Sequence, residues 1–569
     1  MGALVQNREE LASEQDVAAA TPANEQTPRS ARAWIVGIGA AVVIPVLLLV
    51  VIELALRLFN VGYSTELTQP CTVHGQPANC YNLFFPAPFF PPGVIKAPQV
   101  FAVPAAKPAG TYRIFVLGES AAMGDPDPAY SFSRYLEVML AQRFPERKFE
   151  VYNTGSVAIN SHVGVLIAKG LANLQPDLVI LYSGNNEVVG PYGPGTALTS
   201  SGMSLPVVRS SIFLRSTRLG QLLTTVGKQK QQWGGMEMFL DKQVPASSPL
   251  MAYVYSNFDA NLRDTITASK RAGAQVIVST VAANLKDCAP FASQHRPGLS
   301  KNELQIWTAL VDEGSRLETA GNYDHALVLY REASKIDDQY AELEFRVARS
   351  LSKLGDNPQA ALHYSRARDL DTLRFRADSR INEINRRADR VGAEVVDADA
   401  IFAQNSPNGM TGSDLVYEHV HMTPAGNYLL AREMFRKVAS QISGQSVSEA
   451  EVPSQTESER GLAFTGYDRY RITNEMLQRL ERPPFATQLN HAEQELRLAL
   501  ALQAPVESPD DSVAEYRSAI AQRPNDRILH YNFGLFLFNF DRDAAAQELV
   551  LSQPWDGFPV FAPDGTRLQ

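Results

Sequence analysis

A serine and a histidine of this chain stand in surroundings that suit nucleophilic catalysis. Ser120 lies between Gly118 and Gly124, directly after a short apolar run. In such a turn the hydroxyl lies at the exposed end of a strand, and the N–H groups of the following helix can stabilise an anion. His421 follows Glu418 by three residues, so the carboxylate could orient the imidazole while its other nitrogen takes the serine proton. The pattern predicts Ser120 as nucleophile, His421 as base and Glu418 as acid.

Each of these residues also has a simpler interpretation. Serine is a common helix N-cap, and Asp414, four residues before Glu418, could serve as the acid instead. His419 would be a partly exposed loop residue, or with His421 a zinc ligand, but no third cluster of ligands is evident in the sequence. We therefore expect neither a metal nor a cofactor.

Two further segments offer hydrogen-bond donors. Gly155 lies two residues after the run FEVYN, and Asn185 and Asn186 follow the run DLVILY. A glycine N–H and an asparagine amide beyond neighbouring strands can point at one oxyanion. The alternative is turn chemistry, which would explain the glycine and needs only one of the two asparagines.

Alternating strands and helices would bring these residues together. Five short apolar runs read as strands: 112–117, 149–153, 177–182, 275–280 and 393–397. Helical stretches between them predict right-handed crossovers and a parallel sheet covered on both faces, an α/β fold of the flavodoxin-like type. Ligands bind such sheets beyond the carboxyl ends of the strands, and the residues singled out above lie there.

An internal repeat interrupts this pattern before the last strand. Residues 321–337 align with 355–371, with matching Gly, Ala, Tyr and Ala residues. A period of about 34 residues is the signature of the tetratricopeptide repeat (TPR), in which small residues let paired helices approach. Residues 511–526 resemble the second helix of another such unit. The sequence predicts helical TPR-like segments inside and after the α/β domain.

The N-terminal part contains a candidate membrane anchor. Residues 34–52 carry no charge and come close to the ~20 apolar residues that cross a bilayer. A cleaved signal peptide is the alternative, but it would have a shorter apolar core followed by small residues, whereas Glu53 and Arg57 follow here. Arg29 and Arg32 precede the span, which favours a cytoplasmic N-terminus.

The rest of the chain would then lie outside the cytosol. There Cys71 and Cys80 could form a disulfide, with two free thiols as the alternative; Cys288 would be a buried small residue. The sequence lacks N-glycosylation sequons, which fits a bacterial envelope protein. We expect a single-pass protein of the bacterial inner membrane, facing the periplasm or exterior.

Composition excludes few classes. The net charge is -9 and no basic patch is evident, so nucleic acid is not an expected partner. The boundaries that we expect are 1–33 for a disordered tail, 34–58 for the anchor, 59–110 for a Pro-rich spacer, 111–300 and 372–442 for the two parts of the α/β domain, 301–371 for the helical insertion, 443–460 for a linker and 461–569 for a C-terminal helical region.

These motifs resemble the four sequence blocks of the SGNH/GDSL hydrolase superfamily. The blocks would be Ser120 in FVLGESAAMG, Gly155 in YNTGS, Asn186 in GNNE, and Glu418 with His421 in YEHVHMTP. The resemblance implies attack of Ser120 on an ester carbonyl, with an oxyanion hole formed by Ser120, Gly155 and Asn186. Three carboxylates depart from the family pattern, with GES for GDS, GNNE for GxND, and Glu418 for the usual aspartate; each adds one methylene.

Two functions are compatible with this sequence. The first is hydrolysis of an acyl or acetyl ester, for example on an envelope polysaccharide or lipid, with the TPR segments docking a protein partner. The second is an assembly scaffold whose hydrolase fold has lost catalysis. Lys286 and Asp287 would border the pocket, and Arg215 and Arg218 lie in a long 190–250 insertion that could form a lid.

Overall fold

The computed structural model describes residues 31–91, 93–94, 99–199, 204–225 and 233–568. Most of the predicted 1–33 tail lies outside the described residues. The chain forms two compact units, which divide between Gly62 and Tyr63.

The first unit contains helix α1, Ala31–Leu58. Its segment Ala41–Leu58 has a mean hydropathy of 2.6, and none of its side chains is buried. Among the described residues this is the one helix long and apolar enough to cross a membrane. It coincides with the predicted span, and Pro45 lies inside it.

A parallel five-stranded sheet forms the centre of the second unit, which confirms the predicted α/β architecture. Its strands are β4 (Thr111–Gly118), β5 (Lys148–Asn153), β6 (Leu178–Tyr182), β7 (Gln275–Ser279) and β8 (Glu394–Val396). They lie in the order β5-β4-β6-β7-β8, so the first strand lies between the second and third, as in flavodoxin-like sheets. The inner strands are continuous apolar runs because helices cover both faces.

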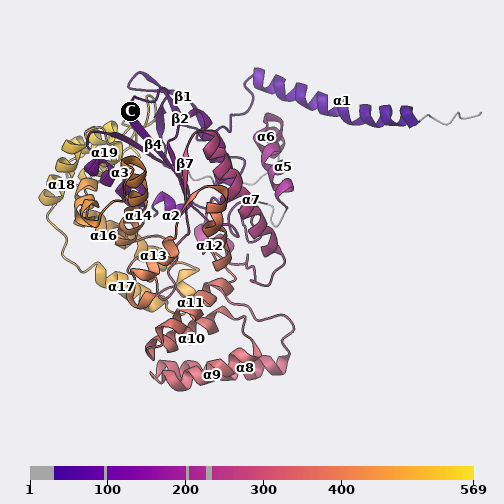
Figure 1. Ribbon diagram of the computed structural model, residues 1–569, viewed down its shortest axis with the longest axis vertical. Coiled ribbons are helices and arrows are strands. Elements are labelled where there is room, and N and C mark those ends of the chain that lie inside the picture. Colours follow the sequence, from indigo (N-terminus) through magenta and orange to yellow (C-terminus); the bar gives the residue numbers. More distant parts are fainter. Residues whose placement is uncertain (1–30, 92, 95–98, 200–203, 226–232, 569) are drawn as a thin grey trace, which may run out of the picture. The chain divides into compact units, whose positions relative to one another are not determined.

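Helices from distant parts of the sequence pack on the sheet (Figure 1). One group, α3 (Phe132–Arg143), α14 (Pro424–Ser443) and α15 (Gln455–Leu462), packs together on one face. The other, α4 (Ser161–Gly170), α7 (Leu250–Arg271) and α12 (Ser379–Arg386), packs together on the opposite face. This part of the chain also contains α2 (Ser120–Met123), α5 (Leu205–Ser216), α6 (Arg218–Thr225) and α13 (Ala398–Gln404).

Four helices form the insertion between β7 and β8: α8 (Lys301–Thr319), α9 (Tyr323–Ile336), α10 (Ala341–Lys353) and α11 (Asn357–Leu370). α8 packs against α9 and α10 against α11 (Figure 1). The matched alanines and tyrosines of the repeat are buried in a second apolar cluster, which also includes Leu285, Ala289 and Met410 from outside the insertion. Gly321 and Gly355 both have a left-handed backbone at the turns. Assignment of these pairs to the TPR class remains a prediction.

The predicted extended spacer is instead folded over much of its length. β1 (Thr68–Val73), β2 (Gln76–Tyr81) and β3 (Ala102–Pro104) form an antiparallel sheet, and a disulfide joins Cys71 to Cys80. The phenylalanines between the prolines are the reason, because Phe85, Phe89 and Phe101 are buried in the main core.

The C-terminal region is helical and lies against the α/β domain. It contains α16 (Gly466–Leu480), α17 (His491–Ala501), α18 (Pro509–Gln522), α19 (Arg527–Leu537) and α20 (Arg542–Leu551). Tyr516 of α18 stacks on Phe533 of α19 in a small apolar core. Ile472 and Met476 of α16 belong to the core of the sheet domain, so this region is not a separate domain.

Candidate active site

Ser120 begins α2, directly beyond the end of β4. It is half-buried, whereas the next three residues are buried, so the hydroxyl is the reachable group of this turn. Gly118 permits the arrangement, because a Cβ there would lie 2.1 Å from the Tyr182 carbonyl oxygen. Gly124 ends the helix with a φ of 96°, a backbone conformation that favours glycine.

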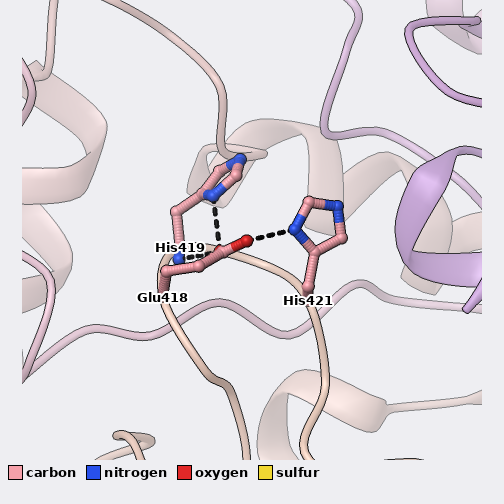
Figure 2. A group of neighbouring side chains, drawn as sticks. All are labelled: Glu418, His419 and His421. Atoms are coloured by element: carbon pink, nitrogen blue, oxygen red, sulfur yellow. Dashed lines mark hydrogen bonds and ion pairs between the residues drawn. The ribbon is translucent and has the colours of Figure 1, made fainter. Parts of the chain in front are cut away.

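The structure brings Ser120, His421 and Glu418 together. His421 Nε2 lies 2.9 Å from Ser120 Oγ, and its Nδ1 is hydrogen-bonded to Glu418 Oε1 (Figure 2). The loop that carries the pair is held at both ends. Tyr417 N–H donates to the His421 carbonyl oxygen over 2.8 Å, and the Thr423 side chain caps α14.

Glu418 is completely buried and fully engaged. Its Oε2 accepts the backbone N–H of His419 and that of Val420, the latter over 3.0 Å, and His419 Nδ1 lies 2.6 Å away. Burial opposes ionisation, but the charges of His419 and His421 outweigh it and hold the pKa of Glu418 well below its usual range. The carboxylate is therefore suited to fix the His421 tautomer and stabilise its charged form.

His419 is buried rather than a partly exposed loop residue, because aromatic rings surround it. Its ring centroid lies 5.5 Å from that of Phe291 and 5.6 Å from that of Phe485. Burial lowers the pKa of His419 despite the adjacent carboxylate. Both histidines face Glu418 (Figure 2). In the described part of the chain the cluster has three members, one fewer than a structural zinc site needs and as many as a catalytic zinc site takes from the protein.

Asp414 does not approach His421. It is exposed; its Oδ2 accepts from Ser406 Oγ over 2.8 Å and its Oδ1 lies 3.6 Å from Lys286 Nζ. Asp287 has a structural contact, since its Oδ2 accepts the Ser413 N–H over 2.8 Å. Of the two acids considered from the sequence, Glu418 is the one in contact with the base.

The two predicted oxyanion donors differ in availability. Asn186 is half-buried, and its Nδ2 donates to the Ile159 carbonyl oxygen over 3.0 Å, which leaves its second amide hydrogen for a ligand. Gly155 N–H donates to Asn153 Oδ1 over 2.9 Å, so it would have to share that bond. A Cβ on Gly155 would lie 2.7 Å from Met123 N; the glycine is therefore required for close approach to α2.

Glu119 and Asn185 hold the turns rather than face a ligand. Glu119 accepts from Ser183 Oγ and Gly184 N–H, both over 3.0 Å, and from Asn185 N–H over 2.8 Å. Burial and the nearby Glu187 raise the pKa of Glu119 to about 8. The longer side chain in GES thus spans from the serine turn to the loop after β6.

The structure adds two charged residues that the sequence did not single out. Asp125 Oδ2 lies 3.1 Å from His421 Nε2, and Arg479 of α16 donates to both oxygens of Asp125, over 2.6 and 3.1 Å. No motif marks either one; a carboxylate five residues after Ser120 was the available signal. Arg215, from the predicted lid, donates to the Pro88 carbonyl oxygen over 2.9 Å. Arg218 begins α6.

No protein-family model and no curated protein matches the sequence. Among solved structures, the chain is similar to an α/β hydrolase enzyme from the metagenome of Lake Arreo, Spain, with 11% identity over 60% of this chain and 99% of that one and a TM-score of 0.26. It is also similar to a lipase/acylhydrolase from Enterococcus faecalis, with 13% identity, 58% of this chain and 96% of that one covered, and a TM-score of 0.26. An acetyl xylan esterase is similar too, with 11% identity, 57% of this chain and 99% of that one covered, and a TM-score of 0.27. At these identities and TM-scores the chemistry of the site has to be judged from its own geometry.

Proposed function

We propose that this protein is a serine ester hydrolase. The observation that carries the proposal is the continuous chain of contacts from Ser120 Oγ through the His421 imidazole to Glu418. His421 Nε2 takes the hydroxyl proton while Oγ attacks the ester carbonyl, and the same proton passes to the departing alcohol. Water then gives a proton to His421 Nε2 and attacks the carbonyl of the acyl-enzyme. The bond to Ser120 Oγ breaks, the proton returns to that oxygen, and the acid is released.

The oxyanion would be bound at the start of α2. The free amide hydrogen of Asn186 and the backbone N–H of Ser120 are the available donors, and Gly155 N–H would join them if it turned from Asn153.

We further propose that α1 anchors the enzyme in the bacterial inner membrane with its catalytic domain outside the cytosol. Arg29 and Arg32 before the span support this orientation, and so does the Cys71–Cys80 disulfide, because such bonds persist in oxidising compartments. The substrate would be an acyl or acetyl ester of an envelope polysaccharide or lipid, and the helix pairs α8–α11 would dock a protein partner.

One observation favours the second candidate, a scaffold without catalysis. Asp125 competes with Ser120 for His421 Nε2, at 3.1 against 2.9 Å, and would favour a protonated base.

Labelling of the full chain in detergent with a fluorophosphonate probe separates the two candidates. We expect labelling and p-nitrophenyl acetate hydrolysis in the natural protein, with both lost in Ser120→Ala and His421→Ala. Ser183→Ala is the matched control, because this half-buried serine donates to Glu119 and not to the base; it should keep the label. A folded natural protein that takes no label and hydrolyses no ester would favour the scaffold.

A further inference from the structure

The C-terminal region places a cation beside the base. Arg479, near the end of α16, holds Asp125 through two hydrogen bonds. Its Nη1 also lies 3.2 Å from His421 Nδ1 and 3.6 Å from Glu418 Oε1. The guanidinium is thus close to both carboxylates that face the imidazole.

The two carboxylates act on different nitrogens. Glu418 accepts from Nδ1, which is the role of a triad acid. Asp125 lies beside Nε2, the nitrogen that must be free of a proton before Ser120 can be deprotonated. An anion at this position holds the proton on the base, and a cation paired with that anion weakens the effect.

We propose that Arg479 is a positioning residue of the hydrolase, which holds Asp125 and offsets its charge so that His421 can act as a base near neutral pH. The inference rests on the proposed function for its catalytic meaning, but the coupling of the three side chains can be measured without turnover. It makes the C-terminal region part of the active site.

The charges around His421 come from three elements. Its own loop supplies Glu418 and His419, the loop after α2 supplies Asp125, and α16 supplies Arg479, with Glu475 3.4 Å from the guanidinium. Burial lowers the pKa of His421, but Glu418 and Asp125 outweigh burial and Arg479, and the pKa is raised. Burial likewise opposes ionisation of Asp125, yet His421 and Arg479 keep its pKa low.

Other contacts hold α16 in place and make Arg479 replaceable. Arg471, on the same helix, forms an ion pair with Asp127 of the same loop. The segment that follows α16 is also held against the sheet domain: Phe485 packs 5.2 Å from Phe291 between ring centroids, and Arg497 of α17 donates to the Tyr417 carbonyl oxygen over 2.8 Å. Loss of the Arg479 pair alone should therefore leave the fold intact.

The test is an NMR titration of His421 in the full chain, labelled at histidine Cε1 and assigned with His421→Gln. Since an opposite charge within a few ångströms shifts a pKa by about 1–3 units, we expect Arg479→Met to raise the His421 pKa by about one unit and Asp125→Asn to lower it by about one. The double variant should return close to the natural value. Arg471→Met is the matched control, which removes an ion pair to the same loop and should leave the titration unchanged.

The pH profile of kcat/KM supplies the catalytic readout. The acid limb should move with the titration, so that Arg479→Met loses about tenfold activity below the His421 pKa and little above it. Equal titrations in Arg479→Met, Arg471→Met and the natural protein would overturn the inference. If the variants show the expected shifts of the His421 pKa but the natural protein takes no fluorophosphonate label, the proposed function is overturned and the coupling of the three side chains stands.

Discussion

Replacement of Glu418 by Gln should abolish most of the activity while leaving the fold. The side chain keeps its size, but its neutral amide cannot stabilise the His421 imidazolium, and its NH2 must face one of the donors now bound by the carboxylate. Loss of a triad carboxylate costs about 10⁴-fold in kcat. Because Asp125 also faces the ring, we expect about 10³-fold, which corresponds to about 4 kcal/mol.

The free energy of unfolding of Glu418→Gln should fall by less than these ~4 kcal/mol. A lost hydrogen bond to a buried donor costs about 1–3 kcal/mol, and one such mismatch is expected, since Glu418 is completely buried. The assay is p-nitrophenyl acetate hydrolysis at a pH above the His421 titration, with denaturant unfolding of the same preparations.

Asp414→Asn is the matched control, since Asp414 is exposed and bound to Ser406. It should retain activity within about threefold, as surface substitutions change little. The reasoning would be refuted if Glu418→Gln kept more than a tenth of the activity, or if Asp414→Asn lost more than Glu418→Gln.

Three further outcomes are expected. Gly155→Ala would place a methyl group 2.7 Å from Met123 N, so it should lower the free energy of unfolding by about 1–3 kcal/mol. Because the methyl group would also move the serine turn, kcat/KM should fall by about 10–100-fold. Unchanged kinetics would show that the turn adapts. The folded-state pKa of Glu119, about 8, lies above its unfolded value, so the stabilisation by this group is complete below pH 4.5 and is lost as the pH rises through 8. In urea unfolding from pH 5 to 8.5, the free energy of unfolding should therefore decline less in Glu119→Gln than in the natural protein. Equal declines would contradict the assignment. Replacement of Cys71 and Cys80 by Ser opens a loop with a sequence separation of 9 and should cost about 2–3 kcal/mol, measured by thermal unfolding against the oxidised natural protein; the reduced natural protein should unfold like the variant.

The sequence predicted the sheet and the positions of the candidate site because both depend on local patterns. A buried parallel strand is a continuous apolar run, and the carboxyl ends of such strands meet at one edge. Ser120 follows from that rule, whereas His421 lies 25 residues beyond Val396, the end of β8, with α13 between them.

Tertiary packing determined what the sequence left open. Arg479 is one arginine among several on an amphipathic helix, and only the packing of α16 turns it toward Asp125. His419 sits in a polar stretch, but Phe291 and Phe485 come from elsewhere to bury it. In the predicted spacer the prolines suggested extended chain, whereas the burial of Phe89 depends on a core that the segment itself does not contain.

The order of these residues along the chain has a consequence during synthesis. The contact between Ser120 and His421 spans 301 positions, and that between Asp125 and Arg479 spans 354. At roughly 5–20 residues per second of elongation, roughly 15–60 s separate the emergence of the nucleophile from that of its base, and Arg479 follows later still. The helices of the insertion emerge in that interval, as do Leu285, Ala289 and Met410, which share their apolar cluster. A nascent chain that ends before His421 would therefore present Ser120 without its partners. The proposed chemistry could begin only after His421 has emerged, and the full arrangement of charges only after Arg479 has followed.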